Sequence, residues 1–590
     1  MQRRKVNPPA PVTSPAQAGS PDRGGPAART AAFLLRGAVA LLATGDRDGR
    51  RVAGLALLLA GAALVFVGAA IGCVHQALFG HDVPVLLDGA WRVYLGQRPH
   101  TDFSSAVGFL GFAVVALAMK LTSPTAEAIA AGNGLLAIVL MAWTWVLGRV
   151  RLPPLFAALL ALYAGALVLG VYPLGQALAE TSYAMLYNRW GWALLLPLLV
   201  ELFAPRAGPA PSRVASIGAG ASSGAAAVLL LADKITFFPP ALALIALAAL
   251  RKRSRDWALG VGAALLAGGL IVLAWLRFDP GPMWSDFSQV ARARSTVIDL
   301  SWHGRAALAA QMEVRSLDLT LGRILATLYA DRVALVAIAL LLVLPWGTRP
   351  DRWRWVAVPA VLGATYAVVL SSWQWGEVPT DTFCVLLLAA GVLAQAGAGW
   401  RKPVAAAVAV LVVGQLLSKE ARGLAGELRW RRRELARVPA SDRMRPAPLA
   451  GLVISEGGGN CRINYGRRVD DGLALLARSV GTPSTVASLD SSSLFSFGLQ
   501  WPVAHRSVLY WAYPASFTPA AHTPPDVAFA DVDLLMFPKC PEDELTLKVL
   551  TDVYGPWLQA RYAPLAESDH WSLLRRREAG PPPAGRASGR

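Results

Sequence analysis

The sequence predicts an α-helical polytopic membrane protein with about 11 transmembrane helices, outer-face juxtamembrane helices and a small C-terminal extracytoplasmic α/β domain. Of its 590 residues, 55% are hydrophobic and only 16% are charged, whereas soluble proteins carry roughly 25% charged residues. The apolar residues form long blocks separated by short basic loops, as in a chain that crosses a membrane many times. The net charge of +18 fits basic cytoplasmic loops better than a DNA-binding face. A soluble enzyme, a nucleic-acid binder and a disordered scaffold are excluded.

The predicted helices follow the apolar blocks in chain order. These blocks lie at about 53–74, 106–121, 126–148, 154–173, 189–204, 214–232, 235–250, 257–277, 332–346, 355–371, 381–398 and 403–417.

Basic clusters between the blocks set the predicted orientation. They lie at 149–151, 206–213, 251–255, 349–354 and 400–402. Two spans separate consecutive clusters, so all five fall on one side, which the positive-inside rule makes cytoplasmic, together with the basic N-terminus. An even number of crossings must then precede Arg149. The short block 106–121 is therefore interpreted as a re-entrant or juxtamembrane helix on the outer face, which leaves 11 spans. If it crosses instead, Arg149 and Arg151 lie outside.

Composition divides the chain into four parts. We expect a disordered basic cytoplasmic tail over 1–50, a transmembrane domain over 51–417, an extracytoplasmic α/β domain over 418–578 and a disordered tail over 579–590.

The C-terminal part alternates short β-like runs with helical stretches, as in a small α/β domain. The expected strands are 452–455, 485–489, 531–537 and 571–574, and the expected helices are 470–478 and 542–554. Cys461 and Cys540 both fall in this part and can form a disulfide in an oxidising compartment, although spacing alone does not establish the pairing.

The most informative segment follows the first span. A short amphipathic helix begins near Val85 and carries Asp88-Gly89, and a turn then contains Gly96, Pro99 and Asp102-Phe103. This segment resembles the first outer loop of the polytopic C-type (GT-C) glycosyltransferases, with a departure at His100. Those membrane enzymes take a sugar from a polyprenyl-phosphate carrier and act on the outer side of the membrane, with about 11 spans and often a C-terminal extracytoplasmic domain.

The resemblance implies that Asp88 is the catalytic acid of this chain. Transfer of a sugar to a hydroxyl needs a base that takes the acceptor proton, and a carboxylate beside a dry pocket is suited to that role. Asp88 can instead cap its own helix. Asp102 either assists Asp88 or forms a turn after Pro99.

Basic residues on the outer face are candidates for binding the donor phosphate. Lys234 follows Asp233 between two apolar blocks with almost no loop, where a lysine is costly unless it pairs or binds an anion. Arg189 begins a span on the same side. The alternatives are an interfacial ion pair or snorkelling for Lys234, and an interfacial anchor for Arg189.

Candidate sugar-binding residues lie in two other outer loops. Aromatic faces and polar groups together suit a sugar, although an aromatic belt gives the same pattern and a loop acid can simply be solvated. These candidates are Glu180, Trp373, Gln374, Trp375 and Glu377. The sequence contains no metal-ligand cluster, and a monophosphate carrier needs no cofactor, although a metal is not excluded.

The resulting hypothesis is an inverting glycosyltransferase of a bacterial inner (plasma) membrane, with Asp88 as general base. Its partners are a polyprenyl-phosphate-linked sugar, membrane lipids and a periplasmic glycan, lipid or protein acceptor. The alternatives are a non-enzymatic flippase or transporter of lipid-linked glycans, which predicts polar residues inside several spans, and an inactive relative that serves as an assembly partner.

Overall fold

The computed structural model describes most of the membrane part and nearly all of the C-terminal domain. The described stretches are 74–76, 82–174, 182–183, 185–203, 211–303, 331–343, 353–372, 378–395, 444–454 and 464–577, with scattered positions at 55–63, 328–329 and 404–429.

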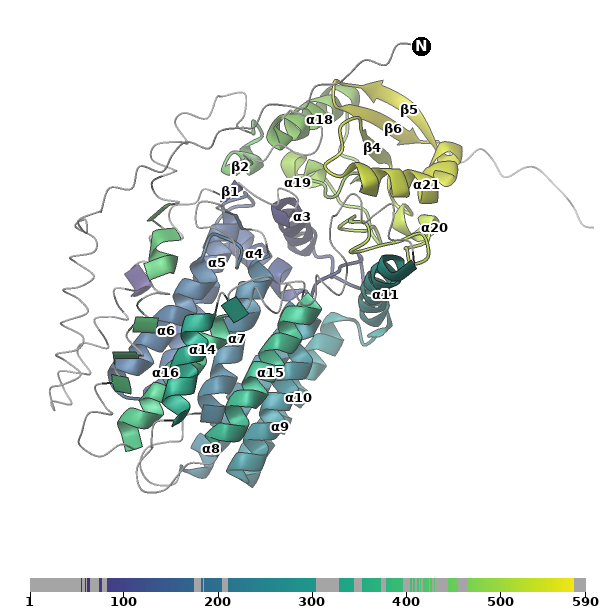
Figure 1. The fold of residues 1–590 in the computed structure, drawn as a ribbon. Helices are drawn as coiled ribbons and strands as arrows, with labels where there is room; N and C mark the ends of the chain where they lie inside the picture. The colour runs from purple at the N-terminus through teal and green to yellow at the C-terminus, as the bar shows by residue number, and fades with distance from the viewer. Residues whose placement is uncertain are drawn as a thin grey trace, which may run out of the picture.

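The described chain is mostly helical, and its long helices run side by side in one bundle (Figure 1). The helices of the membrane part are α3 (Asp82–Tyr94), α4 (Leu110–Leu121), α5 (Ala128–Gly148), α6 (Pro154–Leu169), α7 (Leu186–Phe203), α8 (Arg213–Asp233), the 3-10 turn η1 (Ile235–Phe237), α9 (Phe238–Lys252), α10 (Arg255–Trp275), α11 (Gly281–His303), α14 (Arg332–Val343), α15 (Arg354–Ser372) and α16 (Pro379–Gln395). Each fully described apolar block of the sequence coincides with one of these helices.

Four helices of the described residues are long and apolar enough to cross a membrane, namely α5, α8, η1 with α9, and α10. By contrast, α4 has 12 residues, a length of about 18 Å against a hydrocarbon core of about 30 Å. Its length agrees with a juxtamembrane position for block 106–121. The protein is therefore a membrane protein with several candidate spans, and the number of 11 stays a prediction.

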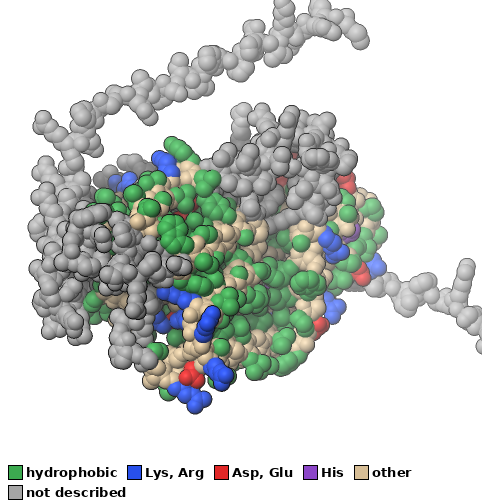
Figure 2. Space-filling model, turned by 60° about the horizontal axis from the view of Figure 1, so that its bottom comes forward, with side chains coloured by type: hydrophobic (Ala, Val, Ile, Leu, Met, Phe, Trp, Pro, Cys, Tyr) green, Lys and Arg blue, Asp and Glu red, His purple; other side chains and the backbone are tan. Residues whose placement is uncertain are grey.

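Three of the predicted cytoplasmic clusters meet at one end of the bundle. Buried Glu201, near the end of α7, forms ion pairs with Arg151 and with Lys252, the latter at 2.6 Å. Because α8 runs opposite to α9, Arg213 at its start lies at this end as well. In Figure 2 hydrophobic side chains cover much of the described surface and Lys and Arg gather at its margin. This arrangement suits a lipid-facing belt that ends at a basic membrane surface.

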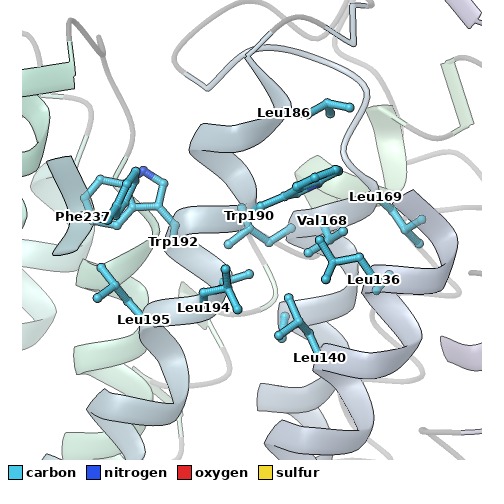
Figure 3. Packing of buried hydrophobic residues seen from close by; sticks show 14 of the residues in the cluster. Leu136, Leu140, Val168, Leu169, Leu186, Trp190, Trp192, Leu194, Leu195 and Phe237 are labelled. Atoms are coloured by element: carbon cyan, nitrogen blue, oxygen red, sulfur yellow. The ribbon is translucent and has the colours of Figure 1, made fainter. Parts of the chain in front are cut away.

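Small residues let two of the spans pack closely. A Cβ on Gly220 of α8 would lie 1.9 Å from the Trp257 carbonyl oxygen, and one on Gly260 of α10 would lie 2.0 Å from that of Ile217. Any larger residue would separate the helices. Beside this pair, Trp190 and Trp192 of α7 lie among leucine and valine side chains, and the Trp192 ring meets Phe237 edge to face at 5.0 Å (Figure 3).

The C-terminal domain is a small mixed sheet with helices. Its strands are β3 (Val486–Ser488), β4 (Leu534–Pro538), β5 (Tyr562–Glu567) and β6 (Trp571–Arg576), in the order β3-β4-β6-β5 with only β3 and β4 parallel. The helices are the 3-10 turn η4 (Ala447–Leu449), α18 (Tyr465–Ser479), α19 (Phe495–Leu499), α20 (Pro525–Ala528) and α21 (Glu544–Arg561).

One expected strand lies outside this sheet. β2 (Leu452–Ile454) pairs in parallel with β1 (Val74–Gln76), a segment that directly follows the first apolar block. The entry to the C-terminal domain is thus tied by backbone hydrogen bonds to the first outer segment of the membrane part.

Candidate functional site

A cavity of about 590 Å³ lies at the opposite end of the bundle from the basic cluster, between the membrane helices and the C-terminal domain. Its charged and hydroxyl-bearing aliphatic side chains come from distant parts of the chain: Asp82, Ser105, Asp233, Lys234, Thr236, Ser371 and Ser516. Its aromatic side chains are Phe112, Tyr183, Tyr187, Trp190, Phe287 and Tyr510. A largely apolar pocket with a few convergent polar groups is the usual form of a small-molecule site.

Lys234 reaches the cavity because α8 stops abruptly. Its backbone is extended, with φ −155° and ψ 120°, directly before η1. The ammonium Nζ donates to Asn188 Oδ1 at 2.9 Å and lies 4.8 Å from the centre of the Tyr187 ring. The side chain is buried. An ammonium held in this way is suited to binding an anion inside the cavity.

The loop beside Lys234 depends on a glycine. The Gly108 N–H donates to the carbonyl oxygen of Asp233 at 3.1 Å. A Cβ at position 108 would lie 2.1 Å from the carbonyl oxygen of Ala232. Only glycine permits this approach, which closes the wall of the cavity between α4 and the end of α8.

Asp82 is the acid that lies at the cavity at the start of α3. Its side chain is half-buried, and Oδ2 accepts a hydrogen bond from the Met185 N–H at 3.1 Å, in the segment that leads into α7. The sequence places Asp82 in the first outer loop, but its pattern gives no reason to prefer it over Asp88. The sequence predicts that the amphipathic helix starts near Val85, whereas α3 begins at Asp82 in the structure.

Asp88 lies two turns further along α3 and is absent from the cavity lining. Its Oδ2 accepts a hydrogen bond from Arg92 Nε at 3.0 Å, and both side chains are buried. Arg92 Nη1 also donates to the Ala504 carbonyl oxygen at 3.0 Å and to Ser507 Oγ at 2.7 Å. Burial raises the pKa of Asp88, and the Arg92 charge partly offsets that rise. The observed contacts of this pair join α3 to the C-terminal domain.

Asp102 also makes contacts away from the cavity. Its carboxylate accepts the Arg98 N–H at 2.8 Å and lies 3.2 Å from Arg277 Nη2, just beyond α10. The neighbouring His100 Nδ1 lies 2.7 Å from Asp286 Oδ2 of α11. The turn that carries the GT-C resemblance therefore joins α3, α10 and α11.

Arg189 is buried beside the cavity but does not line it. Its guanidinium donates to the Tyr172 carbonyl oxygen at 2.7 and 2.9 Å and to Glu420 Oε1 at 3.2 Å. These contacts link α7 to the end of α6 and to a late segment of the membrane part. Arg189 and Lys234 are thus not brought together around one anion.

The remaining candidates lie outside the described residues: Glu180, Trp373, Gln374, Trp375 and Glu377. Cys540 is in a disulfide, and Cys461 also lies outside the described residues. Among the described residues, no group of three or more His, Cys, Asp or Glu side chains is placed to hold a metal ion.

Together these features define a membrane protein whose helix bundle carries a partly polar, aromatic-rich cavity at one end, closed by a C-terminal domain. The structure is similar to that of ArnT from Cupriavidus metallidurans, a GT-C polyprenyl-phosphate-sugar glycosyltransferase. The apo structure has 13% identity and a TM-score of 0.36, over 88% of this chain and 98% of ArnT. The structure bound to undecaprenyl phosphate has 14% identity and the same TM-score, over 91% and 100%.

At this identity and TM-score, the likeness assigns no residue and no activity to the chain. No family model and no curated protein matches the sequence.

Proposed function

We propose that the chain is an integral-membrane glycosyltransferase that moves a sugar from a polyprenyl-phosphate donor to an acceptor hydroxyl outside the cytoplasm. The observation that supports this most strongly is that one cavity is lined by two carboxylates, Asp82 and Asp233, and an ammonium, Lys234, together with six aromatic rings. These groups match what the reaction needs: a base, a cation for the leaving phosphate and apolar faces for the sugar.

In the proposed step the acceptor oxygen attacks the anomeric carbon of the donor sugar. The bond between that carbon and the phosphate oxygen breaks, and a new carbon–oxygen bond to the acceptor forms with inversion. The acceptor proton passes to the Asp82 carboxylate, and the polyprenyl monophosphate leaves with the electron pair. Lys234 stabilises the charge on that phosphate. The chain's own residues account for each proton and charge.

The proposal assigns the base to Asp82 instead of Asp88. A base has to lie within hydrogen-bond reach of the acceptor proton. Asp82 lines the cavity, whereas the Asp88 carboxylate is engaged by Arg92 at 3.0 Å and both side chains are buried. Asp88 is therefore proposed to have a structural role.

The position of the cavity suits a lipid-linked donor. Lys234 directly follows the span α8, at the bundle end opposite the Arg151–Glu201–Lys252 cluster. We place the donor phosphate at Lys234 and its chain in the bilayer beside the helices. If the positive-inside orientation holds, the cavity opens on the periplasmic side.

The test is a glycan and glycolipid profile of the source cell, of a deletion strain and of the deletion strain that carries the wild-type gene. A glycosyltransferase predicts that one sugar disappears from a surface glycan, that its lipid-linked form accumulates on the outer face, and that the gene restores both. Accumulation of the lipid-linked sugar on the inner face would instead identify a flippase. An unchanged profile would contradict both functions.

A further inference from the structure

One segment of the C-terminal domain reaches into the cavity. Leu509 packs against Phe103 and Phe112 of the membrane part. Two residues later, Trp511 is buried in the C-terminal core, with its ring stacked on Phe529 at 6.3 Å. Tyr510, between them, lines the cavity. Because Leu509 packs on the membrane part and Trp511 packs in the C-terminal core, both parts of the protein position Tyr510 between them.

Hydrogen bonds fix the turn after Tyr510. Ser516 Oγ accepts the Ala512 N–H at 2.9 Å and donates to the Tyr510 carbonyl oxygen at 3.0 Å. The carbonyl oxygen of Ser516 in turn accepts from Gln289 Nε2 of α11 at 3.2 Å. The Trp511 N–H donates to the Ser491 carbonyl oxygen at 3.0 Å. This turn is therefore held in place before any ligand binds, which lowers the entropy that binding would cost.

The segment before Tyr510 is joined to the first outer loop. The Ser104 N–H donates to the Ser507 carbonyl oxygen at 3.2 Å, and the Arg506 N–H donates to that of Asp102. Arg92 adds the hydrogen bond to Ser507 Oγ described above. The wall formed by the C-terminal domain is thus positioned by the first outer loop, whose residues Ser105 and Gly108 also line the cavity.

The electrostatic surroundings of Tyr510 include groups from both domains. Burial raises the pKa of its phenol well above the usual value, and the nearby Asp82, Tyr187, Glu542 and Asp543 raise it further. The phenol therefore keeps its proton at neutral pH and can donate a hydrogen bond. Tyr510 and the proposed base Asp82 both line this cavity.

We propose that Tyr510 is an acceptor-binding residue, and that the segment around it forms the subsite for the hydroxyl-bearing glycan that receives the sugar. This inference rests on the proposed glycosyltransferase function. A donor attached to a lipid reaches Lys234 from the bilayer, so the opposite wall is left for the acceptor. That wall is formed by Leu509, Tyr510, Ala515 and Ser516 of the C-terminal domain. The base must touch the acceptor, and Tyr510 lines the same cavity as Asp82, whereas the Ser516 hydroxyl is hydrogen-bonded within its own turn.

The test compares purified full-length wild type, Tyr510→Phe and Tyr510→Ala in lipid nanodiscs. Tyr513→Phe serves as the matched control, because Tyr513 lies in the same turn but does not line the cavity. Membranes of the deletion strain supply the acceptor and its extracted lipid-linked sugars supply the donor. Transfer is measured as the amount of membrane is varied, and undecaprenyl phosphate is used separately as a probe of carrier binding.

We expect Tyr510→Phe to raise the half-saturating amount of membrane about 5- to 10-fold, the value of one hydrogen bond, with a larger rise for Tyr510→Ala. Binding of undecaprenyl phosphate should stay within twofold of wild type, as should both properties of Tyr513→Phe. An unchanged half-saturating amount, or an equal loss of carrier binding, would overturn the proposal. If wild type itself transfers no sugar, the glycosyltransferase function fails, and this inference fails with it for that separate reason.

Discussion

Asp88 and Arg92 lie one turn apart on α3 and form a buried ion pair at 3.0 Å that holds the C-terminal domain on the membrane part. Arg92 Nη1 donates to the Ala504 carbonyl oxygen and to Ser507 Oγ, so the guanidinium bridges two regions that are more than 400 residues apart in sequence. Asp88, which the sequence favours as the catalytic acid, thus does not line the cavity. It holds Arg92, which in turn binds the C-terminal domain that forms one wall of the cavity.

Loss of this pair should loosen the C-terminal domain. Arg92→Met leaves the Asp88 carboxylate buried without its partner, and removal of one member of a buried pair costs about 3–5 kcal/mol. We expect a lower melting temperature and faster proteolysis between residues 501 and 516. A variant in which both residues become apolar, Asp88→Leu with Arg92→Met, should recover part of the loss. Equal stability of Arg92→Met and wild type would contradict this role.

Lys234 should determine carrier affinity. Replacement by Met keeps the length of the side chain but removes a charge-assisted contact of about 1.5–3 kcal/mol, so binding of undecaprenyl phosphate should weaken about 10- to 100-fold. Lys120→Met, at an exposed position at the end of α4, is the control and should bind like wild type. The measurement is a titration in nanodiscs. The same affinity for both variants would remove Lys234 from the phosphate site.

Gly108→Ala should disturb the cavity through its backbone. The added methyl would lie 2.1 Å from the Ala232 carbonyl oxygen and 2.7 Å from that of Asp233, so the loop must move away from Lys234. Such overpacking costs about 1–3 kcal/mol. Gly218→Ala, where no atom lies within 4 Å, is the matched control. We expect weaker carrier binding in Gly108→Ala alone, and equal binding in both variants would count against the close approach.

A buried acid in the C-terminal domain predicts a pH dependence of stability. Burial, with a smaller contribution from Glu542, raises the pKa of Asp490 from 3.8 to about 6. A raised pKa means that its contribution is fully present below about pH 4 and is lost as the pH rises through 6. The shift corresponds to about 3 kcal/mol.

Asp490→Asn removes this titration and keeps an oxygen for the N–H groups of Ser491 and Glu542. Thermal unfolding between pH 4 and pH 8 should show wild type losing stability relative to Asp490→Asn as the pH rises. Asp526→Asn, an exposed position, is the control. A constant difference across this range would show that Asp490 does not titrate in this way.

The periodic and compositional features of the chain were predictable, because they depend on local sequence. The apolar blocks predicted most helices of the membrane part, and the alternation of β-like and helical runs predicted β3, β4, β6, α18 and α21. The helix α11 was missed because it lies between two apolar blocks, in a stretch expected to be a long loop. The strand β5 was missed because its sequence, Tyr-Ala-Pro-Leu-Ala-Glu, has a proline and few β-formers. The pairing of β2 with β1 joins segments about 380 residues apart, which no local pattern can indicate.

The candidate site was predicted only in part. Lys234 was found because a lysine between two apolar blocks is costly, and this cost is visible in the sequence. Asp82 and Asp88 lie on the same short helix, and only the packing of Arg92 against the distant Ser507 separates a cavity-lining acid from a paired one. Tyr510 could not be predicted, because its role depends on how the two domains meet.

The most direct test of the account compares Asp82→Asn with Asp88→Asn in the deletion strain, at matched levels of membrane-inserted protein. The readout is the surface glycan that the deletion lacks. We expect Asp82→Asn to lose about 100- to 10,000-fold in transfer rate, and so to resemble the deletion, while it binds undecaprenyl phosphate like wild type. Asp88→Asn should be less stable but should restore the glycan. Restoration by Asp82→Asn and failure of equally abundant, folded Asp88→Asn would contradict the account and return the base to Asp88.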